Sequence, residues 1–175
     1  MKIFSKWFKG KKTAAAHQPA PQRASSDTSQ SSTRSIRYDP ELVGNLREDH
    51  KQLVAMYKAL GDDVRAGVYT KIPHALLAFK TRLDAHLLIE NVRFYVYLEQ
   101  SMADDHENLA LIRGFRSEMN KIARGVVEFV RRYQSTTVTT DNVDTFIEEY
   151  GAVGTLLAMR IEHEESNLYT LYHPH

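Results

Sequence analysis

The sequence contains no cysteine among its 175 residues. This absence excludes a disulfide scaffold, a cysteine-ligated zinc site and a thiol nucleophile. It also fits a reducing compartment, where disulfides are rare. With 42% hydrophobic residues, the chain is long enough and apolar enough to form one ordinary soluble domain with its own core.

Long apolar runs and a strong charge of either sign are missing as well. No apolar run reaches the length of a membrane span, and lysines interrupt the apolar residues near the N-terminus, which therefore does not read as a secretory signal. The formal net charge of +1 gives the whole molecule no electrostatic bias toward nucleic acid. We therefore expect a cytoplasmic protein with no nucleic-acid partner.

Motifs of the common enzyme classes are also absent. The sequence has no phosphate-binding glycine loop, no nucleophile elbow and no zinc-protease helix motif. We therefore expect a protein that is not an enzyme.

The first 35 residues differ in composition from the rest. Residues 1–12 place lysines opposite an isoleucine, a tryptophan and two phenylalanines on a helical wheel. Such a short basic amphipathic segment can bind weakly to an anionic membrane surface, lie in a partner's groove, or remain a disordered start of the chain. Residues 13–35, rich in Ala, Pro, Gln, Ser and Thr, are predicted to be a disordered linker.

Residues 36–175 are predicted to form an all-α, up-down-up-down four-helix bundle. Apolar residues recur there at alternating spacings of three and four, the pattern of a helix that packs one face into a bundle. The first helix is expected to begin with a cap at Asp39 and to end at Gly61. The second is expected from about Pro73, and the fourth from a cap at Asp141.

Five polar side chains interrupt these apolar seams: His50, His86, Glu90, Arg160 and Glu164. Each lies well inside its helix, and the bundle can bring all five to a similar depth. Buried charge is costly unless it is paired or bound to a metal. Imidazole and carboxylate together suit iron, manganese or zinc. The seams therefore predict either a metal site or a polar layer that satisfies itself through pairing of Arg160 with a carboxylate.

The same residues resemble a known family. Leu46-Arg-Glu-Asp-His50, His86-x-x-x-Glu90 and Glu164-Glu165-x-x-Leu168-Tyr169 resemble the hemerythrin-like (HHE cation-binding) domain, over residues 38–172. The resemblance implies a four-helix bundle with a non-haem di-iron centre that handles oxygen, nitric oxide or iron, or acts as a sensor. It implies ligand roles for His50, His86 and Glu90.

The second half departs from the family's pattern. Met119 and Arg160 stand where the pattern has histidines. Arginine stays protonated and cannot be a ligand. We therefore expect a partial site that binds either one metal ion, non-haem iron, or no metal. Its predicted ligands are His50, His86, Glu90 and Glu164, with His163 as a weaker candidate that requires a rotated fourth helix.

A fainter resemblance favours a bundle without metal. Residues 158–164 and 94–97 are similar to the Rsd/AlgQ regulators, helical proteins that bind the primary sigma factor of RNA polymerase. Two functions therefore remain open. One is a metal-binding protein for oxygen, nitric oxide or iron sensing or storage. The other is a metal-free bacterial regulator that binds a protein partner or a membrane surface.

Overall fold

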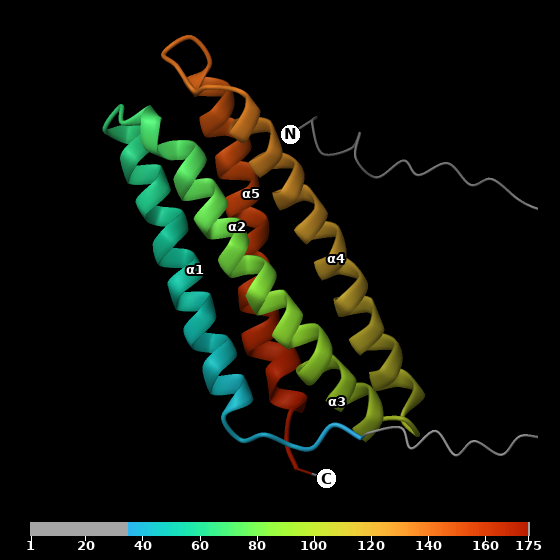
Figure 1. Cartoon of the computed structure of the whole chain (residues 1–175). Helices are drawn as coiled ribbons and strands as arrows, with labels where there is room; N and C mark the ends of the chain where they lie inside the picture. Colours follow the sequence, from blue (N-terminus) through green and yellow to red (C-terminus); the bar gives the residue numbers. More distant parts are fainter. Residues whose placement is uncertain (1–34, 175) are drawn as a thin grey trace, which may run out of the picture. The chain divides into compact units, whose positions relative to one another are not determined.

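A computed structural model of the protein describes residues 35–174, which fold into a bundle of long helices (Figure 1). The amphipathic segment 1–12 and the linker predicted for 13–35 lie outside the described residues, apart from Ser35. Residues 35–174 contain no strand. The main helices are α1 (Leu42–Arg65), α2 (Ile72–Ile89), α3 (Tyr95–Ser101), α4 (His106–Ser135) and α5 (Val143–His163).

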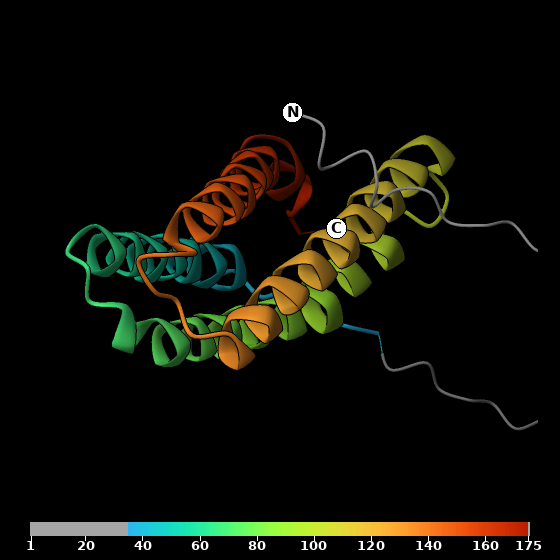
Figure 2. The same cartoon turned by 90° about the horizontal axis from the view of Figure 1, so that it is seen from above.

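The helices pack side by side in a ring. Neighbouring pairs are α1 with α2, α2 with α4, α4 with α5, and α5 with α1. Figure 2 shows the bundle from above, with α4 running alongside α2 and α3. A short π-helix, η3 (Glu90–Phe94), joins α2 to α3 without a break, so these three elements serve as one bundle helix. The predicted all-α four-helix bundle is confirmed.

The N-caps of two helices differ from the predicted caps by one or two residues. The N-cap of α1 is Glu41 rather than Asp39, because the Asp39 side chain accepts a hydrogen bond from the Glu41 amide just before the helix. The N-cap of α5 is Asn142 rather than Asp141, and its side chain closes the preceding loop by accepting from the Thr139 amide. The start of α2 at Ile72 agrees with the prediction.

The prediction that the first helix ends at Gly61 is wrong, because α1 continues to Arg65. Gly61 is buried inside the helix, where a Cβ atom would lie 2.6 Å from the Tyr150 hydroxyl. Gly154 on α5 plays the matching role, since a Cβ there would lie 2.9 Å from Cε1 of Tyr57. Both glycines are therefore explained by close packing between helices rather than by helix termination.

The two tyrosines beside these glycines tie α1 to α5. The Tyr57 hydroxyl donates to the Tyr150 carbonyl at 2.7 Å, and the Tyr150 hydroxyl donates to the Tyr57 carbonyl at the same distance. Their rings stack with centroids 4.4 Å apart. We call this reciprocal pair the tyrosine clasp.

Two clusters of buried apolar side chains fill the bundle, one toward each end. One includes Leu53, Leu83 and Phe146, and the other includes Leu46 and Phe94. Along α1, His50 lies between Leu46 of one cluster and Leu53 of the other. The polar seam residues therefore occupy a layer between two apolar cores. Within residues 35–174, no helix combines the length and the apolar composition required of a membrane span.

A second π-helix, η4 (Glu164–Leu168), follows α5 directly. In η3 the amide of Tyr95 bonds to the carbonyl of Glu90, and in η4 the amide of Tyr169 bonds to the carbonyl of Glu164. This five-residue spacing is the mark of a π-turn, and such turns are frequent at functional sites. Each π-helix begins at a buried glutamate and is followed by a buried tyrosine.

Candidate metal centre

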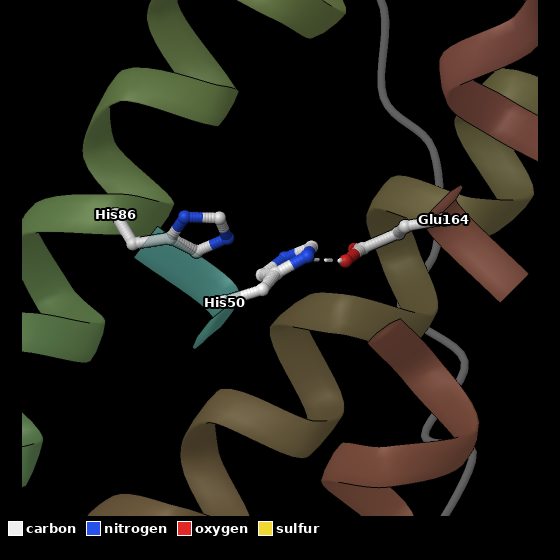
Figure 3. Close-up of side chains that lie close together, drawn as sticks. All are labelled: His50, His86 and Glu164. Atoms are coloured by element: carbon white, nitrogen blue, oxygen red, sulfur yellow. Dashed lines mark ion pairs between the residues drawn. The ribbon is translucent and has the colours of Figure 1, made fainter. Parts of the chain in front are cut away.

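The five polar seam residues all lie inside the bundle. Their exposed fractions are 4% or less, and Glu90 is completely buried. We call this set the polar layer; it consists of His50, His86, Glu90, Arg160 and Glu164. Figure 3 shows three of its members pointing toward one another from different helices.

His50 is held by carboxylates on both ring nitrogens. Its Nδ1 lies 2.8 Å from Oε1 of Glu165. Its Nε2 lies 3.3 Å from Oε2 of Glu164, the ion pair drawn in Figure 3. Burial by itself would lower the pKa of His50, but the hydrogen bonds to Glu164 and Glu165 raise it above the ordinary value. Glu165 therefore fixes the ring so that Nε2 faces the centre of the layer.

His86 faces His50 from α2, with the two ring centroids 4.7 Å apart. Its Nδ1 lies 3.7 Å from Oδ2 of Asp49, which is itself paired with Arg82. Burial, together with the neighbouring His50, lowers the pKa of His86 to about 4. His86 is therefore a neutral imidazole at physiological pH, the form that binds metals.

Glu90 is only partly satisfied. Its Oε1 accepts a hydrogen bond from the Tyr169 hydroxyl at 3.3 Å, while its Oε2 is buried without a hydrogen-bond partner. Burial raises the pKa of Glu90 well above its usual range, and the charge of Glu164 adds to the effect. Burying a carboxylate with an unpaired oxygen costs free energy, and protonation or metal binding of Glu90 would remove that cost.

Arg160 lies in the same layer and pairs with a carboxylate. Its Nε donates to Oε1 of Glu164 at 2.7 Å, and one terminal nitrogen donates to the Tyr95 hydroxyl at 2.7 Å. The other terminal nitrogen lies 3.7 Å from Oε2 of Glu118. These contacts leave Oε2 of Glu164 directed at His50. Glu164 thus holds the guanidinium with one oxygen and presents the other to the histidines.

Three side chains come together as metal ligands would. One donor atom from each of His50, His86 and Glu164 lies within 4.8 Å of the other two. Glu90 borders this group but is not part of it. His163, the weaker candidate, is exposed to solvent, since it precedes the inward-facing Glu164 by one residue and α5 is not rotated as that role would require.

A cavity of about 190 Å³ adjoins the three side chains. His50, His86, Arg160 and Glu164 line part of it, and most of the remaining lining is apolar, including Phe79 and Met119. The lining also reaches Lys58, which is exposed on α1. The cavity therefore gives small ions or molecules space beside the three side chains and a direction of access.

Sequence reasoning missed four residues that shape the layer: Asp49, Tyr95, Glu165 and Tyr169. The Tyr95 hydroxyl accepts a hydrogen bond from Arg160, and the Tyr169 hydroxyl donates one to Glu90. A signal was available in the sequence, because both glutamates are followed by tyrosine at the fifth position. Residues five apart share a face only across a π-turn, so an α-helical period conceals this pattern.

The comparisons with known proteins agree with this geometry. The family model described as Hemerythrin HHE cation binding domain matches residues 41–172. Searches of curated proteins and of solved structures gave no match. Nothing in these comparisons supports the fainter resemblance to the sigma-factor regulators. The match covers the whole bundle and most of the chain, and the chain therefore belongs to the hemerythrin HHE cation-binding family.

Proposed function

We propose that this protein binds one transition-metal ion, with ferrous iron the first choice, between His50, His86 and Glu164. The observation that carries the proposal is the approach of their three donor atoms to within 4.8 Å inside the bundle. Two imidazoles and one carboxylate form a ligand set typical of non-haem iron, and the same set also suits zinc.

The surroundings of the ligands support this role. Glu165 lies 2.8 Å from Nδ1 of His50 and orients that ring, whereas Asp49 lies 3.7 Å from Nδ1 of His86, beyond hydrogen-bond distance. Metal-binding histidines are commonly oriented in this way by outer carboxylates, which also raise the basicity of the ligand nitrogen. Glu90, with its unpartnered Oε2 beside the group, is suited to hold a proton or to join the ligands when a cation arrives.

We further propose that the bound ion serves sensing rather than bulk storage. A single buried site holds one ion for each chain, which suits a switch better than a store. Bound ferrous iron would supply open coordination positions for a small molecule such as oxygen or nitric oxide. Within this proposal the protein is not an enzyme, and His50 and His86 serve only to hold the ion.

Metal analysis of the full-length protein tests the proposal. Purified protein is loaded anaerobically with Fe(II), desalted and analysed by inductively coupled plasma mass spectrometry. We expect about one iron for each wild-type chain and a loss of most of it in His86→Ala. The control is His163→Ala, which changes an exposed histidine one residue from the site. Absence of iron in the wild type, or equal loading of His86→Ala, would contradict the proposal.

The pairing of Arg160 with Glu164 favours a second candidate, a metal-free bundle that binds a protein partner or a membrane surface. An arginine already neutralises one buried carboxylate, so the layer can be stable without metal. Wild-type protein that takes up no iron and whose lipid or partner binding depends on residues 1–12 would support this candidate. Vesicle flotation and pull-down with and without residues 1–12 provide that measurement.

A further inference from the structure

The two halves of the bundle repeat each other around the polar layer. Residues 46–50 read Leu-Arg-Glu-Asp-His, and residues 115–119 on α4 read Phe-Arg-Ser-Glu-Met. In the same way, segment 86–95 has glutamate at its fifth position and tyrosine at its tenth, as does segment 160–169. Under this correspondence His50 matches Met119, and His86 matches Arg160.

The structure supports the correspondence independently of the sequence. The π-helices η3 and η4 begin at the fifth residue of their segments and have the same length. Oxygen–nitrogen distances also repeat: Asp49 lies 3.7 Å from His86, and its counterpart Glu118 lies 3.7 Å from Arg160. The layer therefore has two equivalent positions, one facing each half of the bundle.

The two positions differ in what fills them. The first half supplies the imidazoles of His50 and His86, and the second half supplies a thioether and a guanidinium. The guanidinium of Arg160 bonds both to Glu164 and to the Tyr95 hydroxyl. Arg160 thus carries a fixed positive charge at the position that corresponds to the neutral His86 in the first half.

The unpartnered oxygen of Glu90 has an explanation in the same repeat. Oε2 of Glu164 has Nε2 of His50 at 3.3 Å. The matching partner for Glu90 is Met119, whose thioether donates no hydrogen bond. Oε2 of Glu90 is accordingly left without a partner. The second position therefore has one carboxylate oxygen without a partner, and Met119 and Arg160 stand where the first position has histidines.

We infer that Arg160 is a built-in cation occupying a second, equivalent metal position, and that it limits the bundle to one metal. The guanidinium supplies the positive charge that a second ion would bring, and it already pairs with Glu164. Replacing Arg160 and Met119 with histidines converts this half into a copy of the first. The wild-type count of one ion rests on the proposed function; the gain of an ion on substitution does not.

Metal stoichiometry of designed variants tests the inference. Full-length wild type, Arg160→His and the double variant Met119→His/Arg160→His are titrated with Co(II). Bound metal is counted by mass spectrometry, and the visible absorption of bound cobalt is recorded. We expect the double variant to bind one more cobalt than the wild type, and Arg160→His alone to bind the extra ion more weakly. The control is Met119→Gln/Arg160→Gln, which removes the cation but adds no imidazole and should match the wild type.

The outcomes separate this inference from the proposed function. If the wild type binds one ion and neither histidine variant binds more, the inference is overturned and the proposed function stands. If the wild type binds none and the histidine variants gain one, the inference stands and the proposed function fails. Circular dichroism identifies variants that fold. If the double variant does not fold, the single variant Arg160→His decides, because it leaves Met119 in the core.

Discussion

Glu165 should strengthen metal binding without touching the metal. Its Oε1 accepts a hydrogen bond from Nδ1 of His50 at 2.8 Å, but 35% of its side chain is exposed. A buried hydrogen bond to a charged group contributes about 1.5–3 kcal/mol. Partial exposure to water reduces this to about 1–1.5 kcal/mol. Because about 1.4 kcal/mol corresponds to a tenfold change in affinity, Glu165→Gln should weaken metal binding about tenfold.

Titration with Co(II), followed through the visible absorption of the bound ion, measures this loss in the full-length protein. The matched control is Glu162→Gln, which removes one carboxylate charge from an exposed position three residues earlier. Both substitutions change the net charge equally, so long-range electrostatics cancel in the comparison. We expect the dissociation constant of Glu165→Gln to rise about tenfold and that of Glu162→Gln to stay near the wild-type value.

Equal dissociation constants for the two variants would refute the argument that Glu165 orients His50. Complete loss of binding in Glu165→Gln would refute it in another way, because it would make Glu165 a ligand rather than an orienting group.

Two further predictions concern the metal-free protein. Gly154→Ala should destabilise it by about 1–2 kcal/mol, because a Cβ would lie 2.9 Å from the ring of Tyr57. Gly151→Ala on the same helix should stabilise the protein by about 0.5–1 kcal/mol, because a Cβ there would have nothing within 4 Å. Urea unfolding measures both changes in the free energy of unfolding. Changes of the same sign in the two variants would contradict the packing argument. His86 has a pKa of about 4 in the folded protein against an ordinary value of 6.5, so the unfolded chain takes up its proton first and stability falls as pH drops between these values. In His86→Gln this pH-dependent loss of stability should vanish. The free energies of unfolding of the two chelator-treated proteins should therefore change relative to each other by on the order of 2 kcal/mol near about pH 5. Parallel curves of stability against pH for the two proteins would exclude this contribution.

The helical period was enough to predict the bundle and the polar layer. His50, His86 and Glu164 each interrupt an apolar seam, and in a bundle a seam can face only the core. The period could not reveal Glu165 as the partner of His50, because it follows an inward-facing residue directly. It also could not place Tyr95 and Tyr169, since residues five apart point about 140° away from each other in an uninterrupted α-helix. The π-turns at Glu90 and Glu164 remove that difference.

Helix ends were less predictable for a different reason. Gly61 has the composition of a helix stop, and only the ring of Tyr150, distant in sequence, explains a glycine inside α1. Asp39 and Asp141 are both good capping residues, but local loop hydrogen bonds place the first helical turn elsewhere. The positions of these helix ends depend on contacts that the local sequence does not reveal.

The order in which the chain is synthesised limits when the polar layer can form. His50 contacts Glu165 across 115 positions of sequence, and the tyrosine clasp joins residues 93 positions apart. A nascent chain that ends before η4 has both histidines but neither Glu164 nor Glu165. Such long-range contacts form only after their loops close, which makes them late events in folding. An ion held by all three side chains would therefore mark chains whose last helix has been translated and docked.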